Sequence, residues 1–393
     1  MHRMVVYIDP IMDFRALPKI ELHAHLSGSI SRRCLHGIWA SKKAAKLTTL
    51  PDPLEAMPEG KHDYCLQTFF PLFTSYIYGL LDDLISVRIS TGDVLQQFAA
   101  DGVRYLELRT TPRRAAKFSR AEHVATVVDT VRNFNAGAGI AGVNAVGNMH
   151  VRLLLSLDRR DSAADARETL ELAKKYSDVV VGIDLCGTPT VRKGAAIRFF
   201  DEYMREAHEA GLQLAVHFGE VRYDTTCNAK EVLEKPGGGG VSAENAEGKE
   251  KMDRVEGVLL QEDKEDEELR IMLGWNPKRL GHVVHVSERV KQMILQQGIG
   301  LTLEMCLSCN VHAKMVESYG GHHFLEWWKA GANLTLGTDD VGVFGSCLSQ
   351  EYRLAAQYFG LSRDDVVRLA RMGIDGIFGG EQEKARLRKI MWK

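Results

Sequence analysis

Short runs of apolar and β-branched side chains recur along the whole chain and predict buried strands. In the first run, 19-KIELHAH-25, Ile20 and Leu22 alternate with polar residues, so they point to one face while His23 and His25 point to the other. Seven further runs have a similar character: 103-VRYLELR-109, 151-VRLLLSLD-158, 179-VVVGIDL-185, 212-LQLAVHF-218, 279-RLGHVV-284, 299-IGLTLEM-305 and 333-NLTLGTD-339. The pattern therefore predicts eight strands.

Segments with helical periodicity separate most of these strands. Examples are 163-AADARETLELAKKYSD-178 and 195-AAIRFFDEYMREAHEAG-211. Strands that alternate with helices form parallel sheets, and eight such units are typical of a (β/α)8 barrel. We therefore predict an α/β fold in which residues 1–393 form a single (β/α)8 TIM-barrel domain.

Two segments interrupt this repeat. Residues 37–100 predict a helical insertion after the first strand, and its aromatic stretch 69-FFPLFTSYIYGLL-81 is expected to pack against the core or line a pocket. Residues 224–270 combine glycines with an acidic run and have few apolar side chains, which is typical of a mobile loop. We expect a surface loop there, with a lid over the barrel mouth as the alternative.

Composition narrows the class of protein. The 393 residues are 45% hydrophobic and 26% charged, with a net charge of −2, so nothing favours bulk attraction to nucleic acid or to a membrane surface. No run approaches the roughly 20 apolar residues of a membrane span, and the N-terminus has no apolar signal core. We expect a cytoplasmic monomer that acts on a small molecule.

The seven cysteines are scattered and odd in number, which fits a reducing compartment better than a disulfide framework. Cys306 and Cys309 form one C-x-x-C pair, but no second pair stands nearby to complete a structural zinc site. A redox role is the alternative to the simpler interpretation, two cysteines at the end of a buried strand.

Ionisable side chains stand at the carboxyl ends of four predicted strands. They are His23 and His25, then His217 and Glu220 in 217-HFGE-220, His282 in 279-RLGHVVH-285, and Asp339 and Asp340 in 337-GTDD-340. A lone H-x-H motif is weak evidence for a metal site, because one histidine can be a polar core residue and the other can be solvated. Four such strand ends are hard to explain by packing, since buried charges cost free energy unless they pair or bind a metal. In a barrel these ends meet at the face that carries catalytic groups.

This donor set suits one zinc ion. Three imidazoles and one carboxylate leave a position for water, and His23, His25, His217 and Asp339 supply those ligands. Zinc lowers the pKa of bound water toward ~7, so hydroxide is available at neutral pH. Glu220 lies past the strand end and could reach over that water, while His282 and Asp340 would flank the open position. The constellation predicts a mononuclear metallohydrolase with one Zn²⁺ per chain.

A binuclear hydrolase of the phosphoesterase type is the alternative. It would need a bridging lysine or glutamate near the fourth strand, where the sequence reads 182-GIDLCGTPT-190 without lysine at the strand end.

The motifs ELHAHLSGS, VGIDLCG, VHFGE, RLGHVVH and LGTDD, in this order, resemble the adenosine deaminase branch of the metal-dependent amidohydrolases. The resemblance covers about residues 17–360, with 224–270 as an extra segment. It implies zinc ligands at His23, His25, His217 and Asp339. Glu220 would protonate purine N1, His282 would orient the attacking water, Asp340 would bond N7, and the Gly187 backbone would meet N3. Hydroxide adds to C6 and the adduct expels the amine, which requires a Glu220 pKa raised by a dry pocket.

The segment 101-DGVRYLELRTTPRRA-115 bears on the substrate. In classical adenosine deaminases this strand end more often reads Arg-x-x-Pro-His. TTPRR, together with 157-LDRR-160, 301-LTLEMCLSCNV-311 and 348-LSQEY-352, resembles the adenosine deaminase-like group, whose members convert N6-methyl-AMP to IMP and methylamine. Two hydroxyls and an arginine fork suit a phosphate. By this resemblance the substrate-binding residues are His25, Ser27, Thr110, Thr111, Pro112, Arg113, Asp158, Gly187 and Asp340, with Thr110, Thr111 and Arg113 at the 5′-phosphate.

Alternatives stay open at this point. The close one is an adenosine or adenine deaminase, which would need no basic segment at the pocket. A second is a catalytically inactive signalling member of the fold, which the intact catalytic positions disfavour. At two positions the chain departs from the family pattern, with Ser27 where Asn is more usual and Cys309 where Ser is expected.

Overall fold

The computed structural model describes residues 12–58, 60–62, 64–137, 149–222 and 266–392. Eight strands pair in parallel, each with the next along the chain. They are β1 (Lys19–His25), β2 (Val103–Thr110), β3 (His150–Asp158), β4 (Val180–Cys186), β5 (Gln213–Phe218), β6 (Arg279–His282), β7 (Thr302–Met305) and β8 (Asn333–Leu336).

The last strand returns to the first and closes the barrel. Just beyond β8, the Asp339 N–H donates to the His23 carbonyl at 2.8 Å, and the His25 N–H donates to the Asp339 carbonyl at 2.9 Å. The predicted (β/α)8 barrel is thus confirmed, and its closure already brings three residues of the predicted zinc set to one place: His23, His25 and Asp339.

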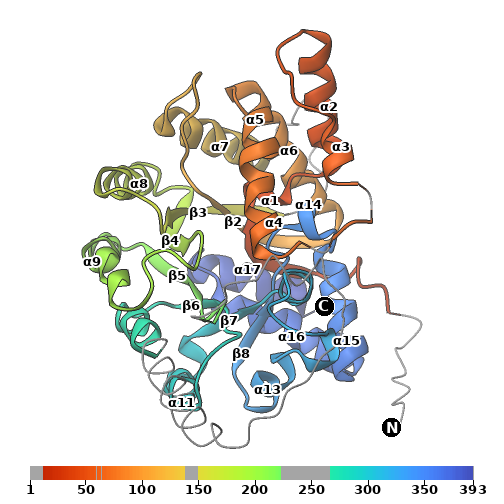
Figure 1. Cartoon of the computed structure of the whole chain (residues 1–393). Coiled ribbons are helices and arrows are strands. Elements are labelled where there is room, and N and C mark those ends of the chain that lie inside the picture. The colour runs from red at the N-terminus through yellow and green to blue at the C-terminus, as the bar shows by residue number, and fades with distance from the viewer. Residues whose placement is uncertain (1–11, 59, 63, 138–148, 223–265, 393) are drawn as a thin grey trace, which may run out of the picture.

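Helices surround the strands (Figure 1). They are α1 (Leu26–Ser29), α2 (Arg32–Ala44), α3 (Pro53–Ala56), α4 (Leu66–Leu72), α5 (Tyr78–Leu80), α6 (Leu84–Ala100), α7 (Arg120–Asn135), α8 (Ala163–Lys175), α9 (Asp201–Glu209), α11 (Glu288–Leu295), α12 (Leu307–His312), α13 (Phe324–Lys329), α14 (Val341–Phe344), α15 (Leu348–Phe359), α16 (Arg363–Gly376) and α17 (Glu381–Met391). A π-helical turn, Phe73–Ile77, joins α4 to α5. In Figure 1 the helices α2 to α6, in orange, form a group on one side of the barrel.

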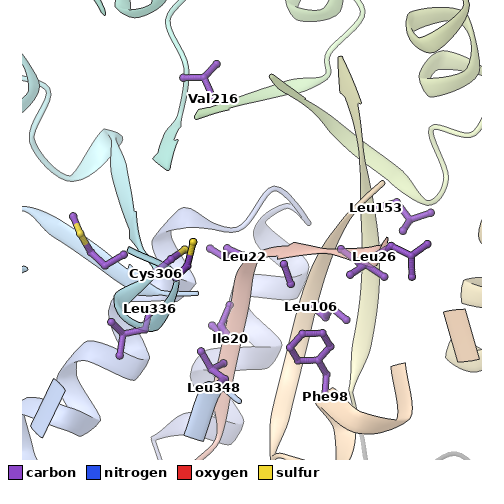
Figure 2. Close-up of a cluster of buried hydrophobic side chains, with 14 of the residues drawn as sticks. Ile20, Leu22, Leu26, Phe98, Leu106, Leu153, Val216, Cys306, Leu336 and Leu348 are labelled. Carbon is purple, nitrogen blue, oxygen red and sulfur yellow. The ribbon is translucent and has the colours of Figure 1, made fainter. Parts of the chain in front are cut away.

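The apolar face of each strand packs outward against these helices. Ile20 and Leu22 of β1 are completely buried, and Figure 2 shows them in a core that also includes Phe98 of α6 and Leu348 of α15. Burying such side chains contributes about 1.5–3 kcal/mol each. The alternation in the first strand therefore sets which side chains point into the barrel.

The barrel interior holds a buried network of charges. Arg109 of β2 donates to Asp184 of β4 at 2.8 Å and also to Glu304 of β7. Arg279 of β6 pairs with Glu304 at 2.7 Å and with Glu107 of β2. All five side chains are fully buried, so each charge depends on its partners. This network lies inside the barrel, beneath the predicted site residues at the carboxyl ends of the strands.

Two further predictions concern the mobile loop and membrane-spanning helices. Residues 224–265 of the expected mobile loop lie outside the described residues. Of the helices in the described part of the chain, none combines the length and the apolar character needed to cross a bilayer.

Candidate active site

The four predicted metal ligands come together at the carboxyl end of the barrel. His23 and His25 close β1, His217 lies near the end of β5, and Asp339 follows β8. One potential ligand atom from each of the four lies within 4.8 Å of the others. The Asp339 Oδ1 is 3.5 Å from the His23 Nε2 and 3.4 Å from the His25 Nε2. Closure of the barrel thus converts distant sequence positions into one cluster.

The backbone at this cluster is strained. His282, Val283 and Asp339 have φ values of 66°, 51° and 58°, a left-handed conformation that costs a non-glycine residue about 1–3 kcal/mol. Gly281 permits the close approach, because a Cβ there would lie 2.5 Å from the His23 ring. Strain concentrated at one end of the barrel is typical of a functional site.

Neighbouring acceptors orient two of the imidazoles. The His23 Nδ1 donates to the Glu304 carboxylate at 2.7 Å, and the His217 Nδ1 donates to the Leu185 carbonyl at 2.8 Å. The other nitrogen of each ring, Nε2, therefore faces the cluster. The His23 Nε2 is fully buried and has no hydrogen-bond partner among the described residues. A lone pair left buried in this way fits a metal ion.

The electrostatics of the cluster also favour a cation. Burial alone would lower the pKa of His217, but Asp184, 3.2 Å from its Nδ1, outweighs burial and raises that pKa to about 9. The His217 Nε2 lies 3.0 Å from the His25 Nε2, so the two nitrogens point into the same space. A metal ion held there would bind both rings in their unprotonated form at these atoms.

We expect Glu304→Gln to lower metal affinity about 10- to 100-fold, because the neutral amide no longer holds His23 as a basic, oriented ligand. Metal content after equilibration against a graded series of chelator concentrations measures this. Glu107→Gln is the matched control: Glu107 belongs to the same buried network, accepts from Tyr105 at 2.6 Å, and makes no hydrogen bond to the four-ligand cluster within the described residues. Equal metal loss in both variants would contradict the role given to Glu304.

Two carboxyl groups beside the cluster are held toward their protonated forms. Burial raises the pKa of Glu220, whose Oε1 lies 3.9 Å from the His282 Nε2. Burial, and then the neighbouring Asp339 carboxylate, raise the pKa of Asp340 well above its usual range. Its Oδ1 is buried and has no partner within the described ranges. Both groups can therefore donate a hydrogen bond or a proton to a bound molecule.

A cavity of about 860 Å³, measured with its open mouth, lies over the cluster. Predicted site residues that line it are His25, Ser27, Thr110, Thr111, Asp158, Gly187, His217, Glu220, Asp339 and Asp340. Aromatic residues of the inserted helices, Phe69, Phe70, Phe73 and Tyr78, also line it, in agreement with the pocket-lining interpretation of that stretch. His23 and His282 lie fully buried behind this lining, each within 3.7 Å of Asp339.

Two glycines make room for polar groups of the cavity. A Cβ at Gly28 would lie 1.5 Å from the Asp340 Oδ1, and one at Gly187 would lie 2.5 Å from the Asp158 Oδ1. Gly187 also has a φ of 96°, which a side chain would strain. Both motifs, HLSGS and DLCG, thus need glycine for close approach.

Pro112 and Arg113 are not among the residues that line the cavity. Arg113 donates to the Leu81 carbonyl, and its guanidinium lies 5.1 Å from the centre of the Tyr78 ring. Arg113, the arginine predicted to bind the phosphate, thus contacts Leu81 and Tyr78 outside the cavity. Thr110 and Thr111 of the same motif line the cavity.

Arg160 lines the cavity instead. Its Nε and Nη2 donate to the two oxygens of Asp158 at 2.8 and 2.6 Å, and no described residue accepts from its Nη1. The sequence motif LDRR contains this residue, but sequence reasoning assigned only Asp158 to the substrate. Which arginine faces a cavity depends on the loop after the strand, and no sequence pattern reports it.

Sequence reasoning also missed Asp184 and Glu304. Both are acidic residues inside apolar strands, and that unusual placement is a signal that could have marked them. Cys306 and Cys309 follow β7, as expected, and both are buried and free of disulfides. Burial raises the pKa of both thiols well above the usual range, so they stay protonated.

Comparison with known proteins finds a matching family model and curated relatives of similar length. The family model for adenosine deaminase matches residues 18–230 and 273–393. A curated relative, N6-Methyl-AMP deaminase-L of Xenopus laevis, is 32% identical over 383 residues, which cover 96% of this chain and 93% of the relative.

Solved structures agree with this relationship. The crystal structure of Arabidopsis N6-mAMP deaminase MAPDA is 31% identical with a TM-score of 0.76, covering 96% of this chain and 98% of that one. Arabidopsis ADAL complexed with IMP is 30% identical with the same TM-score of 0.76, covering 96% and 97% of the two chains. Sequence and structure therefore point to the same relatives over nearly the whole length.

Proposed function

This chain belongs to the adenosine deaminase family, and from that premise we propose that it is a purine nucleotide deaminase that hydrolyses N6-methyl-AMP to IMP and methylamine. Other N6-substituted purine nucleoside monophosphates would be further substrates. The observation that carries the proposal is one cavity that lies over the four-ligand cluster and is lined by Glu220, Thr110, Thr111 and Arg160. The metal cluster and Glu220 suit attack on a purine ring, whereas the two threonines and Arg160 suit binding of a 5′-phosphate.

Zinc is the metal we propose, one ion per chain. The donor set of His23, His25, His217 and Asp339 fits Zn²⁺, which prefers imidazole and carboxylate ligands and keeps one position open in catalytic sites. When bound there, zinc would supply Lewis-acid activation of water at neutral pH.

The chain's own residues would position the purine and move protons. Glu220, held toward its protonated form, would donate a proton to N1 as water adds to C6, which removes the aromaticity of the ring. Purine N7 is only an acceptor, so the protonated Asp340 carboxyl would donate to it. The Gly187 backbone N–H would donate to N3. One hydrogen of the added water would pass through the Glu220 carboxylate to N6, so that the C6–N6 bond breaks and methylamine leaves. The other, released from the C6 hydroxyl as the carbonyl forms, would return Glu220 to its protonated form.

The phosphate would bind on the β2–β4 side of the barrel mouth. Thr110 is the last residue of β2 and Thr111 follows it. Asp158 is the last residue of β3 and Arg160 lies two residues beyond, whereas the metal cluster lies at the ends of β1, β5 and β8. Two hydroxyls and a guanidinium can accommodate phosphate oxygens. IMP made in this way would feed purine nucleotide salvage, which fits the cytoplasmic monomer expected from the sequence.

Arg160→Met is expected to raise KM for N6-methyl-AMP about 10- to 100-fold with little change in kcat, because it removes a charged hydrogen bond to a group remote from the reacting carbon. Steady-state kinetics on N6-methyl-AMP and N6-methyladenosine measure the effect, which should be absent for the nucleoside. Arg114→Met is the control, since it removes a comparably exposed Arg–Asp pair outside the cavity. Unchanged KM in the Arg160 variant would refute this phosphate site.

The function itself is tested by offering N6-methyl-AMP, AMP, N6-methyladenosine and adenosine to zinc-loaded protein and separating the products by chromatography. We expect IMP and methylamine from N6-methyl-AMP and little turnover of the nucleosides. Preference for adenosine would favour the second candidate, an adenosine or adenine deaminase. The position of Arg113 outside the cavity is the observation that keeps this candidate in view.

A further inference from the structure

We infer that Asn310 and His322 hold His282 in the tautomer that carries its hydrogen on Nε2, so that His282 enters the reaction as a hydrogen-bond donor and is neither a metal ligand nor a base. The catalytic part of this inference rests on the proposed function. The structural part, which nitrogen carries the hydrogen, stands on a chain of three hydrogen bonds.

The chain begins at a donor whose role is fixed. The backbone N–H of Phe324, at the start of α13, donates to the His322 Nδ1 at 3.0 Å. An imidazole nitrogen that accepts a hydrogen bond carries no hydrogen, so the His322 hydrogen must be on Nε2. The His322 side chain is buried, and burial lowers its pKa well below the usual value, which agrees with a neutral ring.

Asn310 is the second member of the chain and fixes the direction of the next hydrogen bond. Its Oδ1 lies 3.1 Å from the His322 Nε2 and therefore accepts that hydrogen. The Asn310 Nδ2 then points the other way, with one N–H toward the His282 Nδ1 at 3.0 Å and one toward the Met315 Sδ at 3.3 Å. Rotating the amide by half a turn would set two donors, the amide and His322, against each other. The His282 Nδ1 is therefore an acceptor.

His282 consequently presents an N–H to the site. Its Nε2 is fully buried and has no hydrogen-bond partner in the described part of the chain. The nearest carboxylate atoms are the Asp339 Oδ2 at 3.7 Å and the Glu220 Oε1 at 3.9 Å. His323 adds a second restraint, since its Nε2 donates to the His282 carbonyl at 2.6 Å and holds the residue in its left-handed conformation.

The fixed hydrogen decides between two possible metal groupings. Besides the four-ligand cluster, ligand atoms of His282, Cys306 and Asp339 also lie within 4.8 Å of one another. Coordination requires an unprotonated imidazole nitrogen and a thiolate. The His282 Nε2 carries hydrogen, and Cys306 is a buried thiol, so this second grouping is unsuited to a metal. Under the proposed function, this donor would instead be available to the attacking oxygen as negative charge develops on it.

The direct test is the ¹⁵N spectrum of zinc-loaded, full-length protein labelled at histidine, with the His282 signals assigned by their loss in His282→Gln. Long-range ¹H–¹⁵N correlations distinguish a ring nitrogen that carries hydrogen from one that does not. We expect His282 to show a protonated Nε2 and an unprotonated Nδ1. A hydrogen on Nδ1, or a metal-shifted Nε2, would overturn the inference, whatever substrate the enzyme takes.

Two variants test the consequence. In Asn310→Asp the carboxylate accepts where the amide donated, so the hydrogen should move to the His282 Nδ1, and kcat should fall about 100-fold or more with KM within about three-fold. In His322→Gln, the conservative variant, the amide can still accept from Phe324 and donate to Asn310, so most of kcat should be retained. An Asn310→Asp variant that keeps full kcat, or keeps hydrogen on Nε2, would refute the role of Asn310. Absence of any deamination by the wild type would instead refute the proposed function, because the spectrum is read without substrate.

Discussion

Replacing Glu220 by Gln is expected to lower kcat for N6-methyl-AMP about 1,000-fold while the metal content stays at one ion per chain. Addition of water to C6 removes the aromaticity of the ring, and it becomes favourable only if N1 receives a proton. Burial raises the pKa of Glu220 and so keeps a proton available. Glutamine has nearly the same shape and can still donate a hydrogen bond, but it has no transferable proton.

The variant separates proton donation from substrate binding. Because the glutamine amide preserves contact with N1, KM should change much less than kcat. Measured metal content provides the control, since Glu220 is not among the four clustered ligands. A decrease in kcat of less than ten-fold would mean that another group protonates N1. Asp340, the second carboxyl held toward its protonated form, would then be the first residue to test.

Replacing a clustered ligand should have an equal or larger effect. His217→Ala removes one of four donors and leaves the His25 ring without its partner at 3.0 Å. We expect the variant to lose its metal on dialysis and turnover to fall about 1,000-fold or more, equivalent to about 4 kcal/mol of transition-state stabilisation.

His208→Ala is the matched control for this loss, because His208 lies exposed near the end of α9, before β5 begins, whereas His217 lies near the end of that strand. Metal analysis of both proteins, together with their thermal unfolding, distinguishes loss of the ion from loss of the fold. A folded His217→Ala protein that retains metal and turnover would refute the ligand assignment.

The parts of this site that sequence reasoning could predict are those set by strand periodicity. His23 and His25 alternate with Ile20 and Leu22, and a residue on a barrel strand can face only inward or outward. Once eight parallel strands are predicted, their carboxyl ends must meet. The structure brings His217 and Asp339 to the same cluster for this reason.

What could not be predicted depends on loops and on packing. Arg113 and Arg160 each follow a strand by a few residues, and either could face the mouth. The structure packs Arg113 against Tyr78 from the inserted helices, and it holds Arg160 at the cavity through Asp158. Such choices depend on contacts between segments far apart in the sequence, for which no period exists.

The relay to His282 is a second example. Asn310 and His322 lie in the segment after β7, and their hydrogen bonds depend on the path of that segment around α12. Asn310 lies in α12 and His322 in the segment that follows it, and nothing in the local sequence distinguishes these two from solvated polar residues. Their burial, visible only in the folded chain, marks them as part of the site.

The most direct test of the whole account is a titration of metal-free protein with zinc, in which N6-methyl-AMP turnover is measured at each step. We predict that IMP formation rises linearly and reaches its plateau at one zinc per chain, because one set of four ligands serves one reaction centre. A plateau at two zinc ions per chain, or full turnover before any metal is added, would contradict a mononuclear zinc deaminase.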